Sequence, residues 1–321
     1  PGLSIRYSDP EDVEALRTKI RSVLELGATH VGLFVDDIPR QLQHPQDQAA
    51  FSDLEEAHIS LANAVFSSLP PGVGLVVCPT EYWGAGTAPS LARLGAGLDP
   101  RIDLYWTGRA VCSQTLDLAD AETFARTAGR PPTYWDNYPV NDVAMGYELH
   151  IGPYRGRDPQ LWRASRGVVA NGMELFEASR IPLATIADFL RDPEGYDPES
   201  SWQRAMRDVV GEPDLPAFAL FADNVRSSCL SADDAPIVEE ALNSALFELE
   251  YGDATTGADR LSSLADRLLE AAAHLLRGPV ANRQLIDEIR PWLVAFEIGA
   301  QAIRAMADLA AAGRLHEDGA E

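Results

Sequence analysis

Five short apolar runs, separated by segments with helical periodicity, constrain the fold of this chain most strongly. They lie at residues 30–35, 74–78, 103–106, 132–135 and 167–170. Each run is typical of a buried strand. Strands that alternate with helices pair in parallel through crossover connections, so we predict an α/β fold built on a parallel sheet.

The segments between these runs carry helix signals. Asp9 suits the cap and Pro10 the first position of a helix that Gly27 ends. Further helices are expected at residues 57–69, 89–98, 119–128 and 183–190. Residues 191–201 contain two prolines, one glycine and several acids, and we predict a linker there.

Beyond about residue 201 the strand signals vanish and the apolar spacing is helical. Two seams repeat every three or four residues: Leu261, Leu264, Leu268, Ala271 and Leu275, then Leu285, Ile289, Trp292, Phe296, Gly299, Ile303 and Met306. They predict a helical bundle, with Pro291 kinking the last helix or lying in its first turn. We therefore expect a sheet domain at 1–196 and a bundle at 197–321, whose surface is the candidate for a homodimer contact.

The charge balance excludes several classes of partner. The 321 residues include 49 acidic and 26 basic ones, for a net charge of −23. Binding to phosphates needs clustered Lys and Arg, so neither nucleic acid nor an anionic membrane is expected as a partner. No apolar run approaches the ~18 residues of a membrane span. The three cysteines and six histidines are widely spaced, so we expect no disulfide framework, metal or other cofactor.

Polar and aromatic residues follow the carboxyl end of each expected strand. Asp36-Asp37 follow the first strand, Tyr82 lies shortly after the second, and Asn137 follows the fourth. In α/β barrels the active site lies at this end of the strands. Five such loops in succession predict an active site there.

The Asp36-Asp37 pair is the strongest catalytic candidate because an apolar strand precedes it. Both carboxylates can face one pocket only where the strand ends and the backbone turns. Two carboxylates in one enclosed site cannot both ionise freely, so their pKa values separate and supply an acid and a base near neutral pH. A solvated loop pair and a metal site are the alternatives that the residues leave open.

Aromatic residues near the same strand ends suit a sugar, whose ring has apolar faces and a polar rim. These residues are Tyr82, Trp83, Trp106, Tyr134 and Trp135. For any one of them a place in the core is about equally expected. Cys78 is expected to be a small buried residue lining the pocket, and His58 and His150 are expected to be structural.

Several motifs occur together in one order along the chain. They are Leu33-Phe34-Val35-Asp36-Asp37-Ile38, Cys78-Pro79-Thr80-Glu81-Tyr82, Trp106-Thr107-Gly108, Trp135-Asp136-Asn137 with Asn141-Asp142, and Gly152-Pro153-Tyr154-Arg155-Gly156-Arg157. This ordered set, over about residues 1–196, resembles glycoside hydrolase family 84, the O-GlcNAcase and bacterial hyaluronidase-type β-N-acetylglucosaminidases. The resemblance implies a bacterial protein with a (β/α)8 TIM barrel, followed by a helical bundle.

The resemblance also implies retaining hydrolysis of terminal β-linked GlcNAc by substrate-assisted catalysis. In that reaction the 2-acetamido oxygen of the substrate attacks the anomeric carbon and forms an oxazoline, an exception to schemes with an enzymic nucleophile. Asp36 would orient and polarise the acetamido N–H. Asp37 would protonate the leaving oxygen and then activate water.

Six further residues receive substrate-binding roles from the resemblance. Tyr82 would hydrogen-bond the acetamido or oxazoline oxygen, and Asn137 would face the acetamide. Trp135 would wall the acetamido pocket, with Cys78 at its base. Asp142 would bind the sugar 4- and 6-hydroxyls, and Asn171 would bind an adjacent hydroxyl.

This sequence departs from the family in its number of strands. Family barrels have eight, and only five are visible here, so we expect strands 4–8 to be present and the first three to be absent. The expected partner is a GlcNAc-bearing glycoside or glycoprotein. The alternatives are a GlcNAc-binding fragment without turnover and a helical interaction module. The sequence does not determine the localisation.

Overall fold

The computed structural model describes residues 2–313. The chain divides into two compact units. We call the first the sheet unit, which comprises Pro1–Asn137 and Gly156–Ala170, and the second the helical unit, which comprises Tyr138–Arg155 and Asn171–Glu321. The expected domain boundary between residues 196 and 197 stays a prediction.

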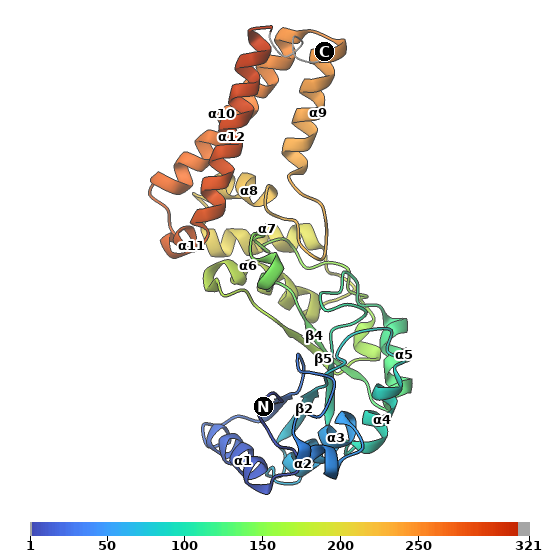
Figure 1. Cartoon of the computed structure of the whole chain (residues 1–321). Helices are drawn as coiled ribbons and strands as arrows, with labels where there is room; N and C mark the ends of the chain where they lie inside the picture. The colour runs from blue at the N-terminus through green and yellow to red at the C-terminus, as the bar shows by residue number, and fades with distance from the viewer. Residues whose placement is uncertain (1, 314–321) are drawn as a thin grey trace. The chain divides into compact units, whose positions relative to one another are not determined.

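The sheet unit contains five parallel strands in the spatial order β1-β2-β3-β4-β5 (Figure 1). They are β1 (His30–Phe34), β2 (Gly74–Cys78), β3 (Asp103–Trp106), β4 (Pro132–Asp136) and β5 (Gly167–Ala170). The sheet curls as half of a barrel, which confirms the predicted partial TIM barrel. Within the described residues, the outer edges of β1 and β5 have no strand partner.

Helices alternate with these strands, as the sequence predicts. They are α1 (Pro10–Leu24), α2 (Pro45–Ala50), α3 (Leu54–Phe66), α4 (Pro89–Gly97), α5 (Leu118–Ala128) and the 3-10 helix η2 (Leu161–Arg163). The expected cap is present, because the Asp9 carboxylate accepts a hydrogen bond from the Glu11 N–H and Pro10 begins the helix. The short helix α2 was not predicted.

Successive strand residues point to opposite faces of the sheet. On one face, Leu33, Val77 and Leu104 are buried in a core that also holds apolar residues of α3, α4 and α5. On the other face, the rings of Phe34, Tyr105 and Trp135 contact one another. The chemistry-bearing residues at the strand ends continue this second face.

The amino ends of the strands are held by a buried arginine. Arg130 is 6% exposed, and its guanidinium donates hydrogen bonds to backbone carbonyl oxygens of three segments. These segments are the end of α4, the residues between α4 and β3, and the end of α5. The acceptors are Gly95, Leu98, Asp99, Ile102 and Ala128. This side chain satisfies helix-terminal carbonyls that have no partner within their helices.

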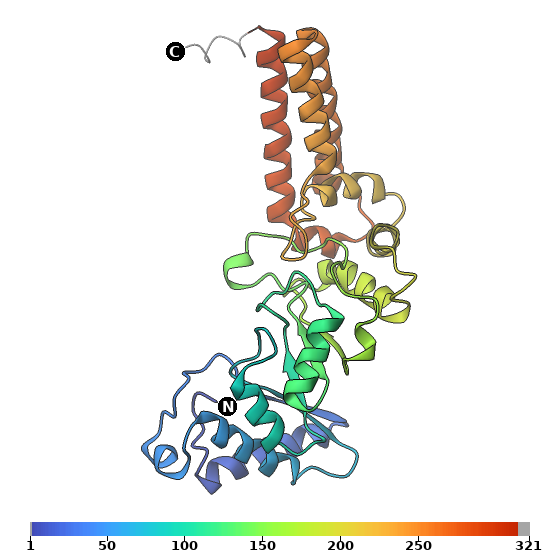
Figure 2. The same cartoon turned by 90° about the vertical axis from the view of Figure 1, so that its right-hand side faces the viewer.

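The helical unit contains the 3-10 helix η1 and seven α-helices. They are η1 (Val143–Met145), α6 (Phe176–Arg191), α7 (Pro198–Val210), α8 (Leu215–Asp223), α9 (Pro236–Tyr251), α10 (Ala254–Arg277), α11 (Arg283–Glu288) and α12 (Arg290–Ala311). Helix α10 packs against both α9 and α12, which run alongside it in orange and red in Figure 2. No described helix is long and apolar enough to cross a membrane.

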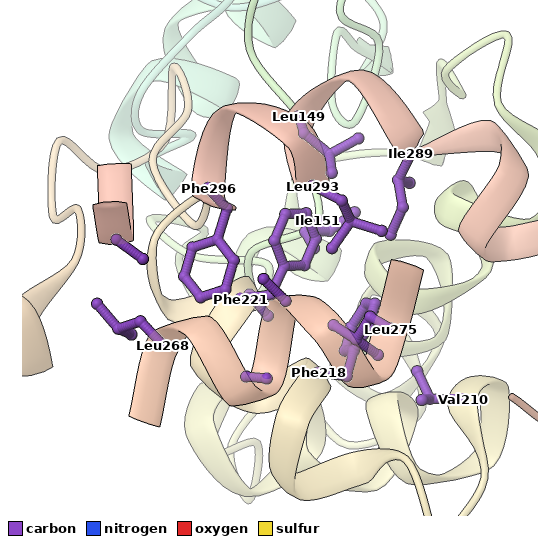
Figure 3. Packing of buried hydrophobic residues seen from close by; sticks show 14 of the residues in the cluster. Leu149, Ile151, Val210, Phe218, Phe221, Leu268, Leu275, Ile289, Leu293 and Phe296 are labelled. Atoms are coloured by element: carbon purple, nitrogen blue, oxygen red, sulfur yellow. The ribbon is translucent and has the colours of Figure 1, made fainter. Parts of the chain in front are cut away.

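The predicted seam of α10 is confirmed, because all five of its residues are buried. The second predicted seam is confirmed at Leu285, Ile289, Phe296 and Ile303, which are buried, whereas Gly299 is exposed and Leu293 and Ala300 of α12 are buried in addition. Pro291 lies in the first turn of α12, one of its two expected places. Figure 3 shows Leu293 and Phe296 packed with Phe221 of α8 and Leu275 of α10.

Helix α6 begins at Phe176, seven residues before the predicted start at Leu183. Pro182 lies inside the helix and is buried. A proline inside a helix removes one backbone hydrogen bond because it lacks an N–H. Burial of Ala178 and Ile181, in the turn before the proline, extends the helix in spite of it.

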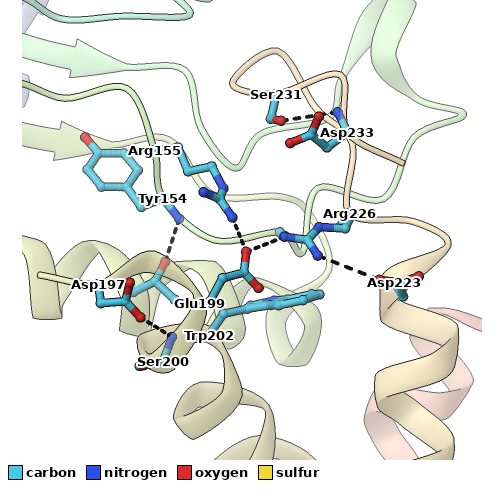
Figure 4. A network of polar contacts seen from close by, with 12 residues as sticks. Tyr154, Arg155, Asp197, Glu199, Ser200, Trp202, Asp223, Arg226, Ser231 and Asp233 are labelled. Carbon is cyan, nitrogen blue, oxygen red and sulfur yellow. Dashed lines mark hydrogen bonds and ion pairs between the residues drawn. The ribbon is translucent and has the colours of Figure 1, made fainter. Parts of the chain in front are cut away.

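A polar network joins three segments of the helical unit (Figure 4). Arg155 and Arg226 both form ion pairs with the Glu199 carboxylate on α7. The Arg226 guanidinium also lies 4.8 Å from the centre of the Trp202 ring. Gly152 makes room for this arrangement, because a Cβ there would come within 2.4 Å of the Arg226 carbonyl oxygen.

Candidate active site

The site lies at the carboxyl end of the sheet, where the chain leaves β1, β2 and β4. Cys78 is the last residue of β2 and pairs with Phe34 of β1. Asp36 and Asp37 follow β1, and Tyr82 lies in the loop after β2. Parallel strands bring these loops to one edge of the sheet.

The two aspartates occupy a backbone turn. Asp37 has φ +46°, a left-handed conformation that L-residues other than Asn and Asp seldom adopt. The turn directly follows the half-buried Asp36, so the backbone turns where the strand ends, as predicted. The Tyr82 hydroxyl donates a hydrogen bond to Asp37 Oδ1 at 3.1 Å. The loops after β1 and β2 therefore meet at a carboxylate and a phenol.

The pKa of Asp36 is raised above its usual value, first by burial and then by the negative charge of Asp37. Cys78 is 4% exposed. Burial raises the pKa of its thiol, and the charges of both aspartates add to that effect. The thiol therefore stays neutral in this environment.

Hydrogen bonds between loops hold Tyr82 in place. Its carbonyl oxygen accepts a bond from the Thr107 N–H at 2.9 Å, and the Thr80 hydroxyl donates to the Val35 carbonyl at 2.6 Å. Burial and the hydrogen bond to Asp37 raise the pKa of Tyr82 to about 12. The phenol thus keeps its proton and remains a donor throughout the neutral range.

The residue before Tyr82 also joins two loops. Glu81 Oε1 forms an ion pair of 2.6 Å with Arg40, which lies three residues after Asp37. Its other carboxylate oxygen accepts a hydrogen bond from the Ser90 hydroxyl on α4. No local sequence pattern indicated these two contacts, because Arg40 lies 41 residues and Ser90 lies 9 residues from Glu81 in the sequence.

The aromatic residues divide between the two faces of the sheet. Trp135 contacts Phe34 and Tyr105 on the face that continues to the aspartates. Trp106 and Tyr134 pack in the helix-covered core, where Trp106 stacks on Phe124, so for these two residues the structure supports the core position, one of the two alternatives that the sequence left open. The structure adds Phe34 and Tyr105 instead, which strand alternation would have identified.

The end of β4 is fixed by two contacts. The Trp135 indole N–H donates to Asn137 Oδ1 at 2.8 Å, and the Asn137 amide nitrogen donates to the Val111 carbonyl at 2.8 Å. Between them, Asp136 forms two hydrogen bonds with the Arg157 guanidinium, at 2.6 and 2.9 Å, and both side chains are almost fully buried. The Asn137 amide is therefore held in one orientation.

Asp142 and Asn171 belong to the helical unit. The carboxylate-bearing Asp142 is exposed and precedes the 3-10 helix η1. The Asn171 carbonyl oxygen accepts a hydrogen bond from the Val140 N–H at 2.8 Å. The roles expected for these two residues stay predictions. Among residues 2–313, no group of three or more His, Cys, Asp or Glu side chains is arranged to hold a metal ion.

Comparison with known proteins decides the family. Residues 1–223 match the NAGidase family model, described as β-N-acetylglucosaminidase. The chain belongs to this family. It is 32% identical over 197 residues to the protein O-GlcNAcases of Rattus norvegicus and Mus musculus. That match covers 60% of this chain and 21% of theirs, so the chain spans about a fifth of the length of these relatives.

Solved structures of the family share the fold. A variant of the O-GlcNAc hydrolase of Thermobaculum terrenum is 32% identical with a TM-score of 0.92, and the match covers 99% of this chain and 69% of that one. CpGH84B is 24% identical with a TM-score of 0.81, over 96% of this chain and 55% of that one, and shows the fold alone. The expected membership in glycoside hydrolase family 84 is confirmed.

Proposed function

We propose that this chain carries the reacting residues of a retaining β-N-acetylglucosaminidase of the O-GlcNAcase type, which releases terminal β-linked GlcNAc. The observation that carries the proposal is the hydrogen bond from the Tyr82 hydroxyl to Asp37, beside the half-buried Asp36. It joins a phenol to one of two adjacent aspartates at the carboxyl end of a half-barrel, in a chain of this family.

The two aspartates would divide the chemistry. Asp36, as a carboxylate, accepts the acetamido N–H of the substrate and stabilises the positive charge that develops as the acetamido oxygen attacks the anomeric carbon. Asp37 gives a proton to the leaving oxygen, then takes one from the water that opens the oxazoline. The C1–O bond to the leaving group breaks as the C1–O bond to the acetamide forms. Water, which gives a proton to Asp37, then forms a new C1–O bond as the C1–O bond to the acetamide breaks, so the acetamide is regenerated and GlcNAc is released with retained configuration.

Tyr82 would change partner when the sugar binds. In the structure its hydroxyl donates to Asp37. An acetamido oxygen that develops charge would compete for this proton, because a donor aimed at developing charge stabilises the transition state. Asn137 would face the acetamide, with Trp135 walling its methyl group and the neutral thiol of Cys78 beneath. The binding of the sugar hydroxyls by Asp142 and Asn171 rests on the resemblance.

A series of substrates with increasing fluorination of the N-acetyl group tests this mechanism. Fluorine withdraws electrons from the carbonyl oxygen and makes it a weaker nucleophile, so we expect kcat to fall steadily along the series for an aryl β-GlcNAc. The matched control is the whole protein with Asp36→Ala, which should hydrolyse none of the substrates in the series. Equal rates along the series would contradict acetamido participation.

Two alternative functions predict different outcomes when the hydrolysis measurements are combined with a measurement of inhibitor binding. A GlcNAc-binding protein without turnover would bind an N-acetylglucosamine-derived thiazoline by calorimetry but hydrolyse none of the aryl substrates. A helical interaction module would bind neither compound. Hydrolysis of the N-acetyl substrate by the wild-type protein excludes both.

A further inference from the structure

The segment from Tyr138 to Gly152 is a loop of the helical unit with its two arms joined by hydrogen bonds. The Tyr138 hydroxyl donates to the Gly152 carbonyl oxygen, and the Asn141 side-chain amide donates to the Glu148 carbonyl oxygen at 2.7 Å. Asp142 lies beyond the last of these contacts, near the tip of the loop. What holds the two arms together therefore also determines where Asp142 lies.

His150 lies between the arms and is completely buried. Its Nδ1 is 2.8 Å from the Val140 carbonyl oxygen, and its Nε2 is 2.8 Å from Glu148 Oε2. The ring stacks on Tyr138 with 6.1 Å between ring centres. The next residue is anchored as well, because the Trp202 indole N–H donates to the Ile151 carbonyl at 2.7 Å.

Both partners of the His150 ring are hydrogen-bond acceptors. A neutral imidazole has one N–H and one lone pair, so it can satisfy only one of them. Both contacts are hydrogen bonds when the ring is an imidazolium beside the Glu148 carboxylate, or when Glu148 itself carries the proton. In either form His150 and Glu148 together hold one proton more than a neutral ring beside a carboxylate.

The tip of the loop needs such an anchor. Val143, directly after Asp142, has φ +49° and is 95% exposed. A β-branched side chain is strained in this conformation, and such strain persists only where the surroundings enforce it. An exposed side chain makes no packing contacts that could do so, and hydrogen bonds anchor the loop instead. Besides those between the arms, the Met145 N–H donates to the Asp142 carbonyl oxygen at 2.9 Å and the Trp292 indole N–H donates to the Tyr147 carbonyl oxygen at 2.8 Å.

We propose that the hydrogen-bonded His150–Glu148 pair is a positioning device that holds Asp142 in place. The proposal rests on the proposed function, in which Asp142 binds hydroxyls of the sugar. The pair acts through the loop backbone and touches no substrate itself.

The central test replaces His150 by phenylalanine in the whole protein. His150→Phe keeps a planar ring against Tyr138 but removes both hydrogen bonds. We expect kcat/KM on an aryl β-GlcNAc to fall roughly 10-fold or more, since small displacements of binding groups have large effects on rate. In the Asp142→Ala background the same substitution should have no further effect, because coupled residues are not additive.

Two variants of Glu148 test its contact with the His150 ring. Glu148→Gln places an amide that can donate to Nε2 of a neutral ring while Nδ1–H bonds to Val140, so activity should stay within about twofold of wild type. Glu148→Leu removes the partner and should resemble His150→Phe. The matched control is His274, whose Nε2 contacts Asp214 at 2.7 Å in the same unit. His274→Phe should lower thermal stability and leave kcat/KM unchanged.

Amide hydrogen exchange separates this inference from the proposed function. If the pair holds the loop, His150→Phe speeds exchange at residues 140–148 and His274→Phe does not, whatever the protein hydrolyses. Unchanged exchange in His150→Phe, or losses that multiply with Asp142→Ala, would overturn the inference. An inactive wild-type protein with faster loop exchange in His150→Phe would count against the proposed function alone.

Discussion

Tyr82 and Asp37, which follow neighbouring strands, share a hydrogen bond of 3.1 Å between phenol and carboxylate. Burial and Asp37 keep the pKa of the phenol near 12, so it donates at every pH at which a glycosidase works. The donor faces the group proposed as the general acid, and the acetamido oxygen is its proposed second partner. Loss of one hydroxyl should therefore weaken two functions of the site.

Tyr82→Phe should lower kcat on an aryl β-GlcNAc about 10²-fold, the usual effect of removing one donor to a developing charge. The ring remains, so the fold should not change. Steady-state kinetics checks the prediction, with Tyr147→Phe as the control because Tyr147 is 77% exposed in the helical unit. Activity within threefold of wild type would remove Tyr82 from the acetamido role.

Asp37→Asn should slow the hydrolysis of substrates with poor leaving groups far more than that of activated ones. Protonation by a general acid matters only when the departing oxygen is basic. The measurement compares kcat/KM on an activated aryl glycoside and on an alkyl glycoside of GlcNAc. Equal losses on both substrates would assign the acid role to another residue.

Asp37→Asn should also move the binding of GlcNAc-type inhibitors on the pH scale. Asp36 must be ionised to accept the acetamido N–H, so affinity falls as the pH drops through its pKa, which burial and the charge of Asp37 raise. The substitution removes that charge and lowers the Asp36 pKa. The loss of affinity should then occur at lower pH than in wild type. Calorimetric titrations between pH 4 and 8 check this, and a shift to higher pH would refute it.

Arg157→Met should destabilise the protein strongly without touching substrate. It leaves the Asp136 carboxylate buried without its partner, a loss of about 3–5 kcal/mol. Arg166→Met breaks the exposed ion pair with Asp103, at 3.0 Å, and should cost no more than about 1 kcal/mol. Urea unfolding of both variants gives the comparison, and similar free energies of unfolding would contradict it.

Local patterns predicted much of the fold. The bounds of β2, β3 and β5 are as expected, because a short apolar run has few alternatives when helical segments flank it. Burial overrode such a pattern in α6, which runs through Pro182. In this helix tertiary packing decided the outcome, and a single sequence does not encode that packing locally.

The candidate site was predictable where it follows strand ends and unpredictable where it depends on pairing across the chain. The Asp36-Asp37 turn could be identified because an apolar strand leads into it. The sequence left the core and the sugar pocket equally open for Trp106 and Tyr134, because proximity to a strand end does not by itself say which face of the sheet a side chain occupies. Contacts such as Arg40 with Glu81 join residues 41 positions apart, which no spacing rule connects.

Arg130 gathers five carbonyl oxygens at the amino ends of the strands, while the aspartates lie at the carboxyl ends. The two ends of the strands thus have different roles. Contacts at the amino ends stabilise the half-barrel, and residues at the carboxyl ends carry its chemistry. Substitutions at Arg130 or Gly95 should therefore lower the melting temperature while the chemistry stays as it is, because Arg130 would lose its carbonyl partners and a Cβ at Gly95 would come within 2.3 Å of the Ala128 carbonyl oxygen. Directed evolution toward new sugars would act at the carboxyl ends, and the two sets of changes should combine freely.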